Sequence, residues 1–180
     1  MVSLLFVFYL FVTLFSIIGS MRGWAKELLV IFSVILGLAF ISVLENLIPF
    51  TKDLFAAGSV ERFWVRTVIV ILLVFFGYQS PKLTQLSRGS ERREQIQEVL
   101  LGLFFGLISG YMIVGTIWSF MDTANYPFKP YISSPDNDPI FGNAAKNLLN
   151  WLPPMTAFGQ HPWIYIVVVL SFIFVMVVFL

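Results

Sequence analysis

The stretch Val99–Met121 reads VLLGLFFGLISGYMIVGTIWSFM and contains no charged side chain over 23 residues. A helix needs about 20 consecutive apolar residues to cross the hydrocarbon core of a bilayer, so this stretch predicts a transmembrane helix. The whole chain has the same character, because 58% of its 180 residues are hydrophobic and 12% are charged. A soluble domain has about 25% charged residues and could not bury this much apolar surface in its own core. The composition therefore excludes a soluble globular domain and a disordered chain.

Further apolar runs lie on both sides of this stretch. They predict an all-α, polytopic integral membrane protein with about five transmembrane helices, at residues 2–20, 27–47, 63–80, 98–121 and 163–180. An amphipathic helix over residues 142–152 is expected to lie on the membrane surface, because its apolar residues gather on one side. We expect residues 1–155 to form the main transmembrane domain and residues 156–180 to add a C-terminal helix.

Basic residues indicate how these helices are oriented. Five spans place the two ends of the chain on opposite sides of the membrane. Lysines and arginines lie in the short connections at residues 20–27 and 81–98, close to the ends of spans. Because such loops stay on the cytoplasmic side, we expect segment 81–98 in the cytoplasm and the N-terminus outside.

The composition also limits the chemistry of the chain. It has no cysteine, one histidine (His161) and a formal net charge of +1. These features exclude disulfides, thiolate metal sites and histidine clusters, and they provide no basic surface for nucleic acid. Asp136-Asn137-Asp138 lacks the glycine and the closing glutamate of a calcium loop, so we interpret it as a turn. We expect no catalytic residue, cofactor or metal; the expected partners are the lipid bilayer and either another membrane protein or a second copy of the chain.

Three glycines recur every four residues in the fourth predicted span, at Gly102, Gly106 and Gly110. This spacing places them on one face of a helix, where another backbone can approach closely. Three interpretations stay open at this point. The glycine face packs inside the chain, joins two copies of the chain, or lines a site for substrate or lipid.

The first two predicted spans are joined by Arg22-Gly23-Trp24-Ala25-Lys26-Glu27. Gly23 permits a tight turn, and Arg22 and Glu27 are placed to pair across it at the membrane boundary. One interpretation is a hairpin turn anchored at the lipid headgroups. The alternative is a site for a ligand or a partner.

Three other charged residues, Glu45, Arg66 and Asp122, fall at the predicted outer ends of spans. Arg66 lies deepest, and a charge at that depth is costly unless it is paired. We therefore expect Arg66 to pair with Asp122 or with Glu45.

Several of these features occur in an order that is typical of one protein family. The first span leads into Arg22-Gly23-Trp24-Ala25-Lys26-Glu27-Leu28, Arg62 and Arg66 precede the third span, and the fourth is a glycine-repeat span that ends in Phe120-Met121-Asp122. Together with the amphipathic segment 142–152, this order resembles the colicin V production protein (CvpA) family. The resemblance covers residues 1–155, and the run at 163–180 departs from it.

The resemblance implies a protein of the bacterial inner membrane with a role in toxin production or export and in envelope physiology. It implies no catalytic residue and no ligand. The leading hypothesis is therefore a non-enzymatic membrane protein of this type. The alternatives are an accessory subunit of a larger membrane complex and a small oligomeric channel or transporter. Few polar residues lie within the predicted spans, which disfavours ion coupling; the spans contain little beyond Thr13, Ser16, Ser33, Ser42, Ser109 and Thr116.

Overall fold

The computed structural model describes residues 3–47, 59–79, 92–128, 131–132, 134–156 and 158–179. Over these residues the chain is all-helical, with six α-helices and no strand. The α-helices are α1 (Leu4–Arg22), α2 (Trp24–Leu47), α3 (Val60–Tyr78), α4 (Arg92–Thr123), α5 (Gly142–Leu149) and α6 (Trp163–Phe179). Two short 3₁₀ helices follow α4 within the described part, η2 (Pro135–Asn137) and η3 (Pro153–Met155).

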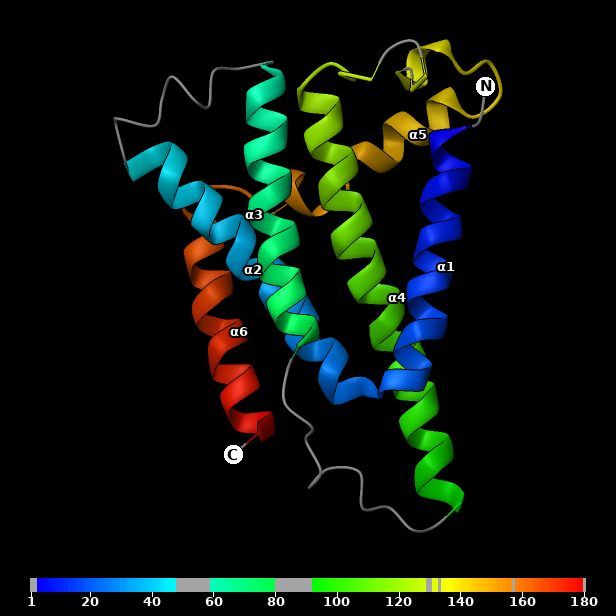
Figure 1. Cartoon of the computed structure of the whole chain (residues 1–180), viewed down its shortest axis with the longest axis vertical. Coiled ribbons are helices and arrows are strands. Elements are labelled where there is room, and N and C mark those ends of the chain that lie inside the picture. The colour runs from blue at the N-terminus through cyan, green and yellow to red at the C-terminus, as the bar shows by residue number, and fades with distance from the viewer. Residues whose placement is uncertain are drawn as a thin grey trace.

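The long helices form a bundle with two distinct ends (Figure 1). α1 descends from the N-terminus at the upper end and meets the start of α2 at the lower end. α4 rises beside α1 in the opposite direction, and α2 crosses the bundle obliquely behind α3. α5 lies across the upper end, and α6 packs against α2. The α1–α4 interface is the most extensive in the bundle.

Local sequence explains where these helices begin and end. α1 ends at Gly23, whose φ of 87° is readily adopted by glycine, and the Gly23 N–H donates to the Gly19 carbonyl at 3.0 Å. α3 begins after Ser59, whose hydroxyl accepts a hydrogen bond from the Arg62 N–H at 3.1 Å. The close turn at Gly23 holds α1 and α2 as a hairpin at the lower end of the bundle.

One predicted helix boundary differs from the observed one. The predicted helix 142–152 is too long, because α5 ends at Leu149. The N–H groups of Trp151 and Leu152 donate to carbonyls only three residues back, and Pro153, which has no N–H, begins η3. The fourth predicted span begins at residue 98, and α4 is helical from Arg92 and continues for 32 residues, so the helix extends beyond the span at its N-terminal end.

Three helices are long and apolar enough to cross a membrane, over Leu4–Arg22, Trp24–Asn46 and Gln95–Thr123. α6 is apolar throughout but has only 17 residues. α3 has 19 residues and carries Glu61, Arg62 and Arg66 in its first two turns. The chain is therefore compatible with a membrane protein. Length and hydropathy alone do not identify α3 and α6 as membrane-spanning helices.

The bundle exposes apolar side chains and buries several polar ones. Large apolar side chains face outward on all five long helices, for example Phe11 on α1, Phe40 on α2, Phe76 on α3, Phe104 on α4 and Phe174 on α6. In contrast, the buried side chains include polar and charged groups, namely Ser16, Glu27, Ser42, Thr67, Ser109, Thr116 and Ser119. A soluble protein has the opposite distribution, whereas polar groups directed into the bundle are typical of helices surrounded by lipid.

Candidate functional site

The three-glycine face of α4 packs on α1 of the same chain. A Cβ atom added to Gly106 would lie 2.6 Å from the Phe15 carbonyl oxygen and 2.9 Å from the Gly19 Cα. A Cβ on Gly102 would lie 2.5 Å from the Gly19 carbonyl oxygen, and one on Gly110 would lie 2.6 Å from the Phe15 Cβ. We call this contact the glycine seam, formed by Gly19 of α1 and by Gly102, Gly106 and Gly110 of α4. The two backbones touch there, so no larger residue fits.

A hydrogen bond fixes the register of the seam. The Ser16 hydroxyl on α1 donates to the Leu103 carbonyl on α4 at 2.9 Å. Ser16 is buried and lies one helical turn before Gly19. In this structure the glycine face is therefore used within the chain, at the position where α1 and α4 are closest.

Arg22, Glu27 and Ser109 meet at the lower end of the bundle and are called here the Glu27 cluster. Arg22 Nη1 donates to Glu27 Oε1 at 2.7 Å, and the Ser109 hydroxyl donates to Glu27 Oε2 at 2.6 Å. The Glu27 side chain is fully buried. The Arg22 guanidinium also lies 4.1 Å above the ring of Tyr78 and donates to the Tyr78 carbonyl. Each carboxylate oxygen of Glu27 thus has a donor, and the charges of Arg22 and Glu27 balance.

Glu45, Arg62 and Arg66 meet near the upper end of the bundle and are called here the Glu45 cluster. Arg66 donates two hydrogen bonds to Glu45, from Nε to Oε1 and from Nη2 to Oε2, both 2.6 Å long. Arg62 Nη2 donates to the same Oε2 at 3.0 Å. The structure therefore places Arg66 on Glu45, one of the two partners expected from the sequence.

Asp122, the other expected partner of Arg66, lies outside this cluster. Its Oδ1 atom accepts a hydrogen bond from the Tyr126 hydroxyl at 2.9 Å. Burial raises the pKa of Tyr126, and the negative charge of Asp122 raises it further. The Tyr126 hydroxyl therefore stays protonated and serves as a donor that satisfies Asp122.

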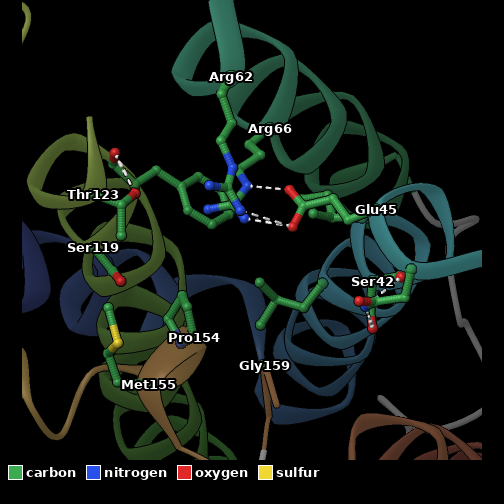
Figure 2. Close-up of a pocket in the computed structure, with 13 residues that line it drawn as sticks. Ser42, Glu45, Arg62, Arg66, Ser119, Thr123, Pro154, Met155 and Gly159 are labelled. Atoms are coloured by element: carbon green, nitrogen blue, oxygen red, sulfur yellow. Dashed lines mark hydrogen bonds and ion pairs between the residues drawn. The ribbon is translucent and has the colours of Figure 1, made fainter. Parts of the chain in front are cut away.

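The Glu45 cluster forms one wall of a cavity of about 210 Å³ (Figure 2). Figure 2 shows the two guanidinium groups reaching from α3 toward Glu45 on α2, with α4 on the opposite side and η3 below. The other polar side chains that line the cavity are Ser42, Asn46, Ser119 and Thr123. The lining residues Pro154, Met155 and Gly159 come from the proline-rich segment that follows α5.

Two polar atoms at this cavity have no hydrogen-bond partner among the described residues. They are the buried Ser119 Oγ and the buried Arg62 Nε. Ser119 is almost completely inaccessible, with 1% of its surface exposed. An unpartnered buried donor is costly, and both of these atoms belong to residues that line the cavity.

The sequence analysis did not identify several members of these sites. Ser109 lies three residues after Gly106, on the glycine-bearing side of α4, and that spacing was its available signal. Ser119 and Thr123 are four residues apart and therefore share one face of α4. Pro154, Met155 and Gly159 had no comparable signal, because their position depends on how a non-periodic segment folds back.

The described part of the chain contains no group of three or more Asp, Glu or His residues able to hold a metal ion.

No protein-family model, curated protein or solved structure matches the chain. The function is therefore inferred from the residues and contacts of the chain itself.

Proposed function

We propose that this chain is a multi-pass membrane protein in which α1, α2, α3, α4 and α6 all cross the bilayer. The observation that carries this proposal is the distribution of side chains. Large apolar residues face outward on α1, α3, α4 and α6, while Glu27 and Glu45 turn toward basic partners inside the bundle. A helix in lipid has to pair its charges internally, and both acids meet that requirement.

Two helices need separate support in this proposal. α3 carries Arg66 one turn after Arg62, and the shared partner Glu45 reduces the cost of placing both charges near the hydrocarbon region. α6 packs on α2, where the rings of Phe32 and Phe172 lie 6.3 Å apart. Its other side carries exposed apolar residues, including Ile166, Phe174 and Val177, and these suit contact with lipid tails.

We place the protein in the bacterial inner membrane as a non-enzymatic member of the colicin V production type, with residues 1–155 as the family-like domain. Its role is to support toxin production or export, or to maintain the cell envelope. The support is the motif order: Gly23 forms the turn between Arg22 and Glu27, and the glycine repeat packs on α1. A bacterial strain lacking the chain is expected to export less toxin or to become sensitive to detergents. Normal export and normal resistance in that strain would refute the role.

The second candidate function is an accessory subunit of a larger membrane complex. The observation that favours it is α6, which packs on α2 and leaves much of its apolar surface uncovered. Purification in mild detergent followed by mass spectrometry distinguishes the two. Other chains in a fixed ratio support a subunit, and the chain alone supports an independent protein.

The proposed topology can be tested directly, because the chain has no cysteine of its own. The variants Ser87→Cys and Asn143→Cys each introduce one thiol for a membrane-impermeant maleimide. We expect Asn143→Cys, at an exposed position of α5, to react in intact spheroplasts, and Ser87→Cys to react only after permeabilisation. Reaction of Ser87→Cys in intact spheroplasts would overturn the orientation. Equal reaction of Ser87→Cys and Asn143→Cys under both conditions would overturn the crossing of α4.

A further inference from the structure

The cavity beside the Glu45 cluster has an unbalanced charge. Its lining contains three ionisable residues among those described, the bases Arg62 and Arg66 and the acid Glu45. Two positive charges against one negative charge leave one positive charge facing a space of about 210 Å³. Asp122 does not line this cavity and is engaged by Tyr126. The excess charge therefore has no counterion within the described residues.

Glu45 holds the two arginines in place without using all of their donors. Arg66 reaches it through Nε and Nη2, and Arg62 through Nη2 alone. A guanidinium group has five N–H donors directed in a plane. The Arg62 Nε is buried and has no partner within the described part of the chain. Glu45 thus fixes the orientation of two guanidinium groups, and each of them keeps N–H donors that do not bind Glu45.

A buried hydroxyl on α4 lies in the wall of the same cavity. Ser119 lines the cavity, is 1% exposed, and its hydroxyl has no partner among the described residues. Figure 2 shows this hydroxyl on the opposite side of the cavity from Glu45, below the guanidinium groups in this view. The two arginines of α3 and Ser119 of α4 therefore line one cavity from different sides.

We propose that this cavity binds one phosphoryl oxyanion, held by Arg62 and Arg66 and by a hydrogen bond from Ser119. Guanidinium groups recognise phosphate oxygens well because of their forked donors. A tetrahedral oxyanion can accept hydrogen bonds from several directions, whereas a carboxylate accepts mainly in one plane. The arginines of α3 and Ser119 of α4 line different sides of the cavity, which favours the tetrahedral group. A singly charged phosphodiester would neutralise the remaining positive charge. This proposal goes beyond the proposed role in toxin export and does not depend on it.

The phosphoryl group has two possible sources, a phospholipid headgroup and free phosphate. The full chain purified in a maltoside detergent, without added phosphate, allows both to be tested. One arm adds inorganic phosphate, and the other adds phosphatidylglycerol in mixed micelles. Binding is measured by equilibrium retention of labelled phosphate and by native mass spectrometry of bound lipid, and sodium chloride at equal ionic strength serves as the salt control.

Two matched variants of α4 test the role of Ser119. Thr116→Val and Ser119→Ala each remove a buried hydroxyl that has no partner within the described part of the chain, and only Ser119 lines the cavity. Removing a hydrogen bond to a charged ligand weakens binding by about tenfold or more. We expect that loss in Ser119→Ala and unchanged binding in Thr116→Val. Arg62→Gln should lose at least as much affinity as Ser119→Ala, because it removes the excess charge.

The outcomes separate clearly. One equivalent of phosphate bound per chain identifies free phosphate as a ligand, and one retained phosphatidylglycerol identifies a lipid headgroup; either supports the site if Ser119→Ala weakens it. Failure of both ligands to bind overturns the proposal. Equal losses in Thr116→Val and Ser119→Ala would also overturn it, because a general effect on α4 would then explain both. The Ser119→Ala variant keeps every charged residue, and its thermal unfolding confirms whether it is folded.

Discussion

The Glu27 cluster and the Glu45 cluster both pair a glutamate with arginine, but they differ in charge balance and in exposure. In the Glu27 cluster one arginine and one serine satisfy the two carboxylate oxygens, and the side chain of Glu27 is fully buried. In the Glu45 cluster two arginines share one carboxylate, and all three side chains retain some exposure beside a cavity. Each acid has two partner residues, so the charge balance around the acid and the exposure of the group, rather than the presence of an ion pair, distinguish a structural contact from a candidate binding site.

The two clusters also differ in where they lie in the bundle. The Glu27 cluster adjoins the glycine seam, because Ser109 lies between Gly106 and Gly110 on α4. The Glu45 cluster lies where α2, α3 and α4 surround open space next to η3. A buried ion pair adds little net stability by itself, but removing one partner leaves an uncompensated charge. The two clusters should therefore respond very differently to substitution.

The largest effect is expected from Glu27→Ala. It leaves the Arg22 guanidinium without its carboxylate, whereas the Ser109 hydroxyl keeps the Gly106 carbonyl as an acceptor at 3.0 Å. Breaking a buried ion pair in this way destabilises a protein by about 3–5 kcal/mol, measured here as the free energy of unfolding in detergent. Glu27→Gln is the matched control, because it keeps the shape and an acceptor for Ser109. Equal stability of Glu27→Ala and the wild-type protein would show that the Glu27 cluster is not structural.

An intermediate effect is expected from Gly106→Ala, which tests the link between the glycine seam and the Glu27 cluster. The added Cβ would lie 2.6 Å from a backbone oxygen of α1, so α1 has to move away. Overpacking of this kind costs about 1–3 kcal/mol. Gly37→Ala is the control, because its nearest neighbour is the Val70 Cγ2 atom at 3.3 Å, which can adjust. If the glycine seam and the Glu45 cluster are independent, Gly106→Ala lowers the free energy of unfolding but leaves phosphate binding at the Glu45 cluster intact.

A smaller effect on folding is expected from Arg66→Leu. Glu45 keeps a hydrogen bond from Arg62 at 3.0 Å, so its charge is not left alone. A double-mutant cycle with Glu45→Gln should give a coupling free energy of about 1 kcal/mol for this partly exposed pair. The same variant should lose phosphate binding. Unchanged folding together with unchanged phosphate binding in Arg66→Leu would refute both the pairing and the binding site.

The smallest effect is expected on the surface, at the pair of Lys146 and Asp136. The hydrogen bond and positive charge of Lys146, with help from Ser134, hold the pKa of Asp136 below its usual range. Because the pKa is lower in the folded state, any stability from this pair is present above the unfolded pKa and is lost as the pH falls through the folded value. Both side chains are more than half exposed, so Lys146→Ala should leave the unfolding midpoint unchanged at neutral pH. A clear loss would show that surface pairs contribute as the buried clusters do.

Several features could be predicted from the sequence because they depend on local spacing. The four-residue repeat placed Gly102, Gly106 and Gly110 on one face, and the five-residue separation placed Arg22 near Glu27 across the Gly23 turn. The helical class follows from long apolar runs in the same way. These features need only helix geometry, which the sequence determines directly.

Other features depend on how distant segments pack, and the sequence did not resolve them. Whether Arg66 meets Glu45 or Asp122 depends on which helix end turns toward α3. Ser109 reaches Glu27 because α2 crosses obliquely and comes beside α4. The cavity also needs η3, whose position follows from prolines and turns that have no periodic pattern.

The spacing of the Glu27 cluster has a consequence for the order in which the protein assembles. A chain synthesised from its N-terminus produces Arg22 and Glu27 together, five residues apart, whereas Ser109 follows Glu27 by 82 residues. Arg22 can neutralise Glu27 as soon as the α1–α2 hairpin exists, long before α4 is made. When α4 packs against α1 in the glycine seam, Ser109 supplies the second side-chain donor to Glu27. Arg22, which is close to Glu27 in sequence, can thus pair with Glu27 before the distant Ser109 is synthesised.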